Sequence, residues 1–540
     1  MPSGWDEKVD FLVVGGGIAG MRAAIELAGA GCTLILTKGA AYEPSTSQAH
    51  RLFSGPPNEE GGASPHLYET LRAGDGLCRE EAVQALVREA PRQIEQLMEW
   101  GLGGGRKASR PFALTESTEG QSRARHLPAE LAGHDLLQLL AAKVRSHRAM
   151  GFRAHSMVTE LLVEDQQVRG VMVLDERAGT FKRILAQGVL LACGGLGQIY
   201  SETTNPEVAC GDGVALAWSA GARLADLEFI QFHPTVLSVK NAPRLVLPEA
   251  LRQSGAYLRN IELERFMPRY HEAGELAPWD VVSRSILMEM QKQRSDFVYL
   301  DVSGLDSEEV EKRFPDVVGT CNQWNIDITS NLVPVRPAAH FAIGGVATDL
   351  DGATTVKGLY AAGETAANGL HGANRLPGNS LLEGLVFGAR AAQAMMARRG
   401  PALLPPPPPT SSKSAKTHHP RPAPSPEPAH VLDPVAILKE TRCLMWQRAG
   451  IIRRGAQLDE AVGRLNGLSV AVRGHPDRRF FEARNVLTVA RLVAGCAAMR
   501  KESRGVHYRS DFPLRNDADL PQHSFVSSNF KLYLSHWASA

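Results

Sequence analysis

The 540-residue sequence predicts an α/β protein with an inserted segment and a helical region near its C-terminal end. Three observations lead to this prediction. An apolar run near the N-terminus ends in a glycine-rich turn and is followed by a helical pattern. Residues 227–342 then interrupt the pattern of this first region, and helical periodicity resumes at residue 434 after a proline-rich stretch. A chain of this length can form two to four domains.

The N-terminal motif is typical of a Rossmann-like dinucleotide-binding unit. The apolar run 10–14 ends in Gly-x-Gly-x-x-Gly, and a helical pattern and a second apolar run at 32–37 follow. The first glycine allows a tight turn, the second lets the backbone approach a pyrophosphate, and the third lets helix and strand pack closely. The start of the helix supplies free N–H groups for the phosphates. The predicted contact residues are Gly15, Gly17, Ile18, Ala19 and Gly20.

The second strand leaves the identity of the dinucleotide open. A carboxylate about 20 residues after the glycines usually binds the ribose 2′-OH. Here the strand ends at Thr37 and Lys38 instead. A lysine suits the 2′-phosphate of NADP, so the residues of this motif alone are compatible with either NADP or FAD.

The other elements of the first region are predicted from periodicity and from flanking glycines. Residues 39–65 form a loop over the cofactor. Helices are expected at 66–101, 134–147 and 379–398, and strands at 161–163, 168–174, 188–195 and 358–362. The strand at 188–195 ends on Gly194 and Gly195, where small residues let the backbone pass the cofactor.

These patterns divide the chain into three folded parts and a linker. The cofactor-binding domain comprises 1–226 and 343–400, and an α+β capping domain is inserted at 227–342. Residues 401–433 are proline-rich and are expected to form an extended linker. Residues 434–540 are expected to form a separate helical domain with a tail.

Composition excludes several classes of partner and site. The formal net charge of +1 argues against nucleic acid or an anionic membrane as a partner. The seven cysteines include no Cys-x-x-Cys, which argues against zinc, iron–sulfur clusters and a disulfide framework, so no metal is expected. The sequence shows neither a signal peptide nor an 18-residue apolar run. A cytoplasmic protein with reduced thiols is therefore expected.

A set of motifs follows in order along the chain: Gly15–Gly20, Leu191–Gly195, Thr203–Pro206, Gly211–Gly213, Gln231–Thr235, Pro337–Phe341, Gly363–Glu364, His371–Arg375, Asn379–Glu383 and Glu502–Pro513. Together these motifs resemble the fumarate reductase/succinate dehydrogenase flavoprotein superfamily, and within it the L-aspartate oxidase branch. The resemblance covers residues 8–398 and 434–513. The resemblance implies FAD rather than NADP, because a lysine after the second strand is usual in this family.

The resemblance also implies roles for side chains at a dicarboxylate site facing the flavin. Arginine offers bidentate donors to a carboxylate and histidine offers a directional one. His233, His340 and Arg375 are expected to bind the substrate carboxylates, and Glu119 is expected to face the substrate amine. Arg284 matches the arginine that moves the substrate proton, and Glu249 and Arg252 match a polar relay beside it.

Cofactor contacts follow from the same resemblance. Glu364 is expected to bind the ribityl chain, and Ser380 and Leu381 begin a helix whose N–H groups face the flavin N1/C2=O edge. Ser45 stands where relatives with a covalent flavin carry a histidine, so the FAD is expected to be non-covalent. The further cofactor-binding residues are Lys38, Gly194, Gly195, Asp212 and Asn379.

The activity implied by the resemblance is oxidation of L-aspartate to iminosuccinate, with O2 or fumarate as electron acceptor. The product would serve quinolinate synthase on the route to NAD. Oligomeric state is not indicated. Two alternatives remain: a soluble fumarate reductase-like or other dicarboxylate oxidoreductase, and a divergent flavoprotein with weak activity. They rest on departures from the family pattern at His50–Phe53, Pro248, Gln253–Ser254 and Gly378.

Overall fold

The computed structural model describes residues 5–40, 45–48, 65–102, 113–114, 125–126, 133–398, 400, 433–469, 476–518 and 522–537. Three predictions concern residues outside these ranges: the role of Glu119, the altered loop at His50–Phe53, and the linker at 401–432.

A mixed sheet forms the centre of the first region, in the order β5-β2-β1-β8-β7-β6, with β15 also paired to β8. The strands are β1 (Glu7–Val14), β2 (Thr33–Leu36), β5 (Met150–Arg153), β6 (Ser156–Glu164), β7 (Gln167–Asp175), β8 (Thr180–Leu191) and β15 (Leu359–Ala361). β1 lies parallel to both β2 and β8, so the predicted strand–helix–strand unit is present. β8 pairs with β7 through its first half and with β15 through its last residues.

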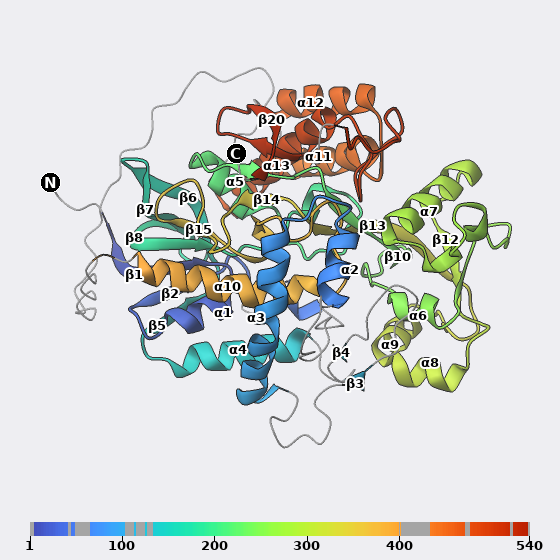
Figure 1. The fold of residues 1–540 in the computed structure, drawn as a ribbon, viewed down its shortest axis with the longest axis horizontal. Helices are drawn as coiled ribbons and strands as arrows, with labels where there is room; N and C mark the ends of the chain where they lie inside the picture. Colours follow the sequence, from blue (N-terminus) through green and yellow to red (C-terminus); the bar gives the residue numbers. More distant parts are fainter. Residues whose placement is uncertain are drawn as a thin grey trace.

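Three helices, α1 (Ile18–Leu27), α4 (Gly133–Ser146) and α10 (Asn379–Ala397), pack against the strands of this sheet (Figure 1). α3 (Glu80–Glu99) packs on α10, and α2 (Pro65–Ala73) packs on α3. The helical pattern at 66–101 thus forms two helices. The chain turns between them because Gly76 has a φ of +75° and a Cβ on Gly74 would lie 2.1 Å from the Sγ of Cys78.

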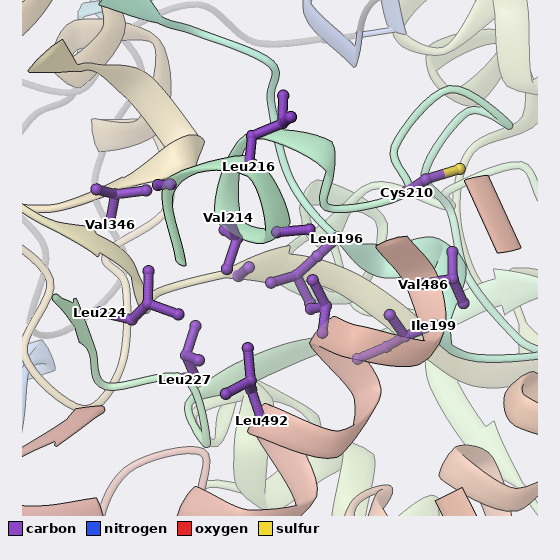
Figure 2. Packing of buried hydrophobic residues seen from close by; sticks show 14 of the residues in the cluster. Leu196, Ile199, Cys210, Val214, Leu216, Leu224, Leu227, Val346, Val486 and Leu492 are labelled. Carbon is purple, nitrogen blue, oxygen red and sulfur yellow. The ribbon is translucent and has the colours of Figure 1, made fainter. Parts of the chain in front are cut away.

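The C-terminal helices pack against the other side of the molecule. They are α11 (Pro434–Ala449), α12 (Gly455–Ser469) and α13 (Arg478–Met499), and α5 (Asp212–Ser219) lies beneath them. Figure 2 shows Val486 and Leu492 of α13 beside Leu196, Ile199 and Leu227. One buried cluster joins these helices to the central sheet. The C-terminal helices therefore share their core with the first region, whereas the sequence suggested a separate unit.

The inserted segment has a core of its own and lies at one end of the molecule (Figure 1). Its antiparallel sheet runs β10-β13-β12-β11. The strands are β10 (Ile230–Leu237), β11 (Tyr257–Arg259), β12 (Val298–Asp301) and β13 (Val333–Ala342), and the helices are α6 (Glu249–Gln253), α7 (Trp279–Gln293), α8 (Ser307–Arg313) and α9 (Pro315–Gln323). β10 and β13 lead into and out of this segment, so their residues lie between the two cores.

The tail forms strands that complete a sheet begun much earlier in the chain. That sheet runs β16-β14-β9-β19-β20. Its strands are β9 (Leu224–Ala225), β14 (Gly345–Ala347), β16 (Ala366–Ala367), β19 (His523–Val526) and β20 (Leu532–Ser535). Two short pairs also occur, β3 (Ala113–Leu114) with β4 (Arg125–His126) and β17 (Ile452–Arg453) with β18 (Tyr508–Arg509). No helix within the described ranges is long and apolar enough to span a membrane.

Candidate active site

A cavity of about 1390 Å³ runs from the glycine turn after β1 to the inserted segment. Its volume exceeds the roughly 300–1,000 Å³ of an ordinary small-molecule pocket, so it can hold a dinucleotide together with a small substrate. Most of the predicted site residues line it. They are Gly15, Gly17, Ile18, Ala19, Lys38, Ser45, Gly194, Gly195, Asp212, His233, Glu249, His340, Glu364, Arg375, Ser380 and Leu381.

The glycine turn has the geometry that its sequence predicts. Gly15 has a φ of +119°, and a Cβ there would lie 2.0 Å from the carbonyl oxygen of Ala192 at the end of β8. A Cβ on Gly20 would lie 2.1 Å from the carbonyl oxygen of Gly15. Gly20 does not line the cavity; it lets α1 pack against the turn.

Two helix N-termini open onto the cavity. The first turn of α1 carries no acidic residue, and the N–H of Ile18 donates to Oγ1 of Thr46 at 3.2 Å. α10 begins after Gly378, whose φ is +94°, and it also has no acidic residue in its first turn. Ends of this kind bind anionic or electron-rich groups. The side chain of Asn379 bonds to His66 and Thr70 and does not line the cavity.

Lys38 is held by two carboxylates. Its Nζ lies 2.6 Å from Oδ2 of Asp212 and 2.8 Å from Oε1 of Glu482, which comes from α13. Burial alone would lower the pKa of Lys38, but the two carboxylates outweigh burial and raise it. Asp212 also accepts from Asn485 at 2.8 Å. Because the lysine charge is neutralised within the protein, it is poorly suited to a 2′-phosphate, and this arrangement favours FAD over NADP.

Glu364 is a buried carboxyl group that lines the cavity. Burial raises its pKa to about 7, although the N–H of Ala342 and the charge of Arg375 partly offset the effect. Its Oε1 accepts from the N–H of Ala342 at 2.9 Å. A Cβ on Gly195 would lie 2.1 Å from that same oxygen, so the position requires glycine to leave room for the carboxyl group.

Two histidines meet where the inserted segment joins the first region. His233 comes from β10 and His340 from β13, and their ring centroids lie 5.4 Å apart. Nδ1 of His233 accepts from the N–H of Thr235 at 3.3 Å, so in the neutral ring the proton is on Nε2. Nδ1 of His340 lies 2.9 Å from Oγ1 of Thr204. These contacts fix both rings against the cavity wall.

Burial keeps both imidazoles neutral. Burial, reinforced by His340, Arg252 and Arg375, puts the pKa of His233 well below its usual range. Burial and Arg375 lower the pKa of His340 to about 3. Both rings therefore serve as neutral hydrogen-bonding groups at physiological pH.

Arg375 is the guanidinium beside these histidines. Its Nε donates to Oε1 of Gln231 at 3.0 Å, and Gln231 donates back to the Arg375 carbonyl at 2.9 Å. Its Cζ lies 4.4 Å from the centroid of the Phe341 ring. Burial lowers the pKa of Arg375 to about 10, so the group stays charged at neutral pH and is oriented to bind an anion.

Two of the three predicted catalytic residues lie outside the cavity lining. Arg284 has its Cζ 4.5 Å from the centroid of the Tyr508 ring and its Nη1 3.7 Å from Oδ2 of Asp280. Arg252 is buried, and its Nη1 donates to the carbonyl of Glu275 at 2.5 Å. Glu249 does line the cavity. The role expected for Arg284, to move the substrate proton, stays a prediction.

The structure adds residues that the sequence did not indicate. Thr46, Glu482 and Asn485 support the nucleotide end, and Trp279 lies beside both histidines. No local pattern identifies Glu482 or Asn485, because their partners lie hundreds of residues away in the chain. Trp279 begins a helix after a proline, but that signal places the helix start and says nothing about the cavity.

The residues at the nucleotide end fit FAD held without a covalent bond. The glycine turn allows close approach, two helix starts without acidic residues face the cavity, and Ser45 lines it at the loop after the second strand. A serine offers no imidazole for attachment to the flavin.

Two family models match the chain. One described as the FAD binding domain matches residues 10–381, and one described as the fumarate reductase flavoprotein C-terminal region matches residues 439–535. The fold thus combines an FAD-binding region with the C-terminal region of fumarate reductase flavoproteins.

Known proteins resemble the chain over nearly its whole length. An L-aspartate oxidase of Streptomyces coelicolor is 38% identical, with 97% of this chain and 92% of that protein covered. An L-aspartate oxidase of Vibrio cholerae is 35% identical, with 94% and 96% covered. A solved quinol–fumarate reductase has a TM-score of 0.86 at 26% identity, with 98% and 97% covered. Mycobacterium smegmatis Sdh1 has a TM-score of 0.81 at 28% identity, with 96% and 91% covered.

Proposed function

Since the chain belongs to the L-aspartate oxidase family, an FAD-dependent group of enzymes that oxidise L-aspartate in NAD biosynthesis, we propose that the cavity beside His233, His340 and Arg375 is its active site. One observation carries this proposal. Three side chains from distant parts of the chain meet in one cavity, and that cavity continues to the glycine turn that suits FAD.

The substrate carboxylates have complementary donors at this end of the cavity. Arg375 offers a charged, pre-oriented guanidinium for one carboxylate. His233 offers its Nε2–H as a neutral donor for the other, and His340 stands beside it. Binding at two fixed points orients the α-carbon of a four-carbon dicarboxylate and leaves it little freedom to rotate.

The reaction breaks the α-carbon C–H bond and removes one proton from the substrate ammonium. When bound, FAD accepts the hydride, which carries two electrons. We assign the ammonium proton to Glu249, a carboxylate that the inserted segment contributes to the cavity lining. Formation of the C=N bond then gives iminosuccinate. Glu119, the other carboxylate proposed to face the amine, lies outside the described residues.

Residues 227–342 are proposed to act as a cap. Their separate core supports this role, as does their contribution of His233, Glu249 and His340 to a cavity that also contains the glycine turn. Arg284 then has a docking role, because its contact with Tyr508 ties the cap helix α7 to the C-terminal region. Arg252 lies behind Glu249 and supports it through charge.

The electron acceptor, the onward route and the location are further proposals. Fumarate is a four-carbon dicarboxylate and fits the same donors, so both O2 and fumarate are proposed to reoxidise the enzyme. The imine product is proposed to enter quinolinate synthesis. The enzyme is proposed to be cytoplasmic, as its balanced charge and scattered cysteines suggest.

Anaerobic mixing with L-aspartate tests the activity. The holoenzyme should lose its flavin absorbance with aspartate and regain it with O2 or fumarate, whereas succinate should bind without rapid bleaching. Glu249→Gln should bleach about 10²–10⁴-fold more slowly, the range expected for loss of a general base. Glu309→Gln, at another carboxylate lining the cavity, serves as the matched control. Flavin that stays oxidised with aspartate would contradict the proposal.

A further inference from the structure

Trp279 is the first residue of α7, and it lines the cavity beside the two histidines. Its ring centroid is 4.5 Å from that of His233, with an interplanar angle of 74°, and 6.0 Å from that of His340, with an angle of 61°. The three rings therefore meet edge to face, an arrangement that holds the indole in a fixed orientation.

The indole N–H has no acceptor within the described part of the chain, although the nitrogen is buried. An unpaired buried donor is costly, and buried tryptophans usually find a partner for this group. Neither neighbouring imidazole accepts from it: Nδ1 of His233 accepts from Thr235, and Nδ1 of His340 lies against Thr204. The missing acceptor is therefore expected to come from a bound molecule.

The angular positions of side chains around α7 explain why Trp279 lines the cavity and Arg284 does not. Trp279 and Arg284 are five positions apart, which places them about 140° from each other around a helix. Trp279 faces the cavity, and Arg284 consequently points toward Tyr508. On this side, the cap thus presents a neutral donor to the substrate, while the charged donor, Arg375, comes from the residues before α10.

From these contacts we infer that Trp279 is a positioning residue that donates its indole N–H to the substrate carboxylate not bound by Arg375. The inference rests on the proposed function. The indole fills the space beside the two histidines, excludes water from that carboxylate and shares it with the Nε2–H of His233. Recognition of the second carboxylate then depends on neutral donors in a pocket without water, so a substrate whose side chain is too short or has no acceptor leaves the indole donor unpaired.

Trp279→Phe tests the inference because it keeps an aromatic ring and removes the donor. Succinate binding to the oxidised holoenzyme, followed through the flavin spectrum, should weaken about tenfold, as loss of one hydrogen bond to a charged group predicts. The KM for aspartate should rise by a similar factor, while the anaerobic bleaching rate at saturating aspartate should change less than about threefold. Trp279→His restores a ring N–H and should recover most of the succinate affinity.

Trp446→Phe is the matched control. Trp446 also packs near this region, with its ring 6.0 Å from Phe232, but it does not line the cavity. Its replacement should leave succinate binding unchanged. Equal succinate affinity in the wild type and in Trp279→Phe, or no recovery in Trp279→His, would overturn the inference. If the wild type binds succinate through Trp279 but aspartate does not bleach its flavin, the inference holds and the proposed function fails.

Discussion

The two neutral histidines in the cavity make the folded protein less stable at acidic pH. His340 has a pKa of about 3 in the folded protein, against about 6.5 in an unfolded chain. Below pH 6.5 the unfolded state takes up a proton that the folded state does not. Stability therefore falls as the pH drops from about 6.5 toward 3, by about 2 kcal/mol at pH 5 for this residue alone.

His340→Gln should reduce the loss of folding stability at acidic pH. The amide can still contact Oγ1 of Thr204, but it does not titrate, so the variant should lose less stability than the wild type between pH 7 and pH 5. Urea unfolding at each pH measures the difference. His147→Gln, at an exposed position, is the control and should leave the slope unchanged. An unaltered slope in His340→Gln would show that this imidazole is not kept neutral by the fold.

Site residues could be predicted from the sequence where a motif fixes the backbone conformation. The directions in which their side chains point could not be predicted. Gly15 has a positive φ, and the glycine motif predicts the tight turn that requires it. Arg284 and Trp279 lie on one helix, but which of them faces the cavity depends on how α7 rotates against β10 and the C-terminal region. That rotation is set by tertiary packing, which a local pattern does not encode.

Helix α10 supports the glycine turn through close contact with α1. A Cβ on Gly388 would lie 2.7 Å from the carbonyl oxygen of Ala19, a backbone atom that can move only with α1. Gly388→Ala should therefore destabilise the protein by about 1–3 kcal/mol through overpacking and should weaken FAD binding, because the start of α1 lines the cavity.

Gly463→Ala is the control for helix propensity. Gly463 lies in α12, and nothing would lie within 4 Å of its Cβ, so alanine should stabilise that helix by about 0.5–1 kcal/mol. Thermal melts and FAD titrations of the apoprotein measure both variants. A Gly388→Ala variant as stable as Gly463→Ala would mean that α1 and α10 are not in close contact.

Helix α13 connects the nucleotide end to the C-terminal region. Glu482→Gln should weaken FAD binding and lower stability by about 1–3 kcal/mol, because Lys38 loses one of its two buried carboxylates. Glu440→Gln removes a carboxylate from an exposed pair with Arg464 and should cost less than about 1 kcal/mol. Fluorescence quenching of FAD on titration gives the affinities. Equal FAD affinity in Glu482→Gln and the wild type would show that Glu482 of α13 does not contribute to FAD binding.

Elements with strong periodicity or glycine boundaries were predictable, and their long-range pairing was not. The helices at 134–147 and 379–398 were expected within one or two residues of α4 and α10. No secondary structure was predicted for the tail, and it contains β19 and β20. Short strands of this kind depend on pairing with β9, which lies about 300 residues earlier, so the local sequence carries little signal for them.

A buried network of charged and polar groups around Glu228 connects distant parts of the molecule. Glu228 accepts from Nε of Arg500 at 2.5 Å and from Oγ of Ser524 at 2.6 Å, and its carbonyl accepts from Arg453. These partners come from β17, the end of α13 and β19. Because Glu228 lies at the entrance to the inserted segment, the network joins the cap, the first region and the tail.

Glu228→Gln should destabilise the protein by about 1–3 kcal/mol, because the buried guanidinium of Arg500 loses one of its two carboxylates and keeps only Glu502. The unfolding transitions followed by circular dichroism and by flavin release should shift together, as the shared core requires. Glu460→Gln, in an exposed pair with Arg448, is the control. Separate transitions for helix content and flavin release would contradict a single cooperative unit.

The contact between Lys38 and Glu482 has a consequence for how the protein is made. The lysine is translated long before its partner helix α13. A nascent chain that stops before α13 has the glycine turn but only part of the wall around the nucleotide. Tight binding of the cofactor therefore has to wait until α13 has been synthesised. Chains that terminate before α13 should accumulate without flavin.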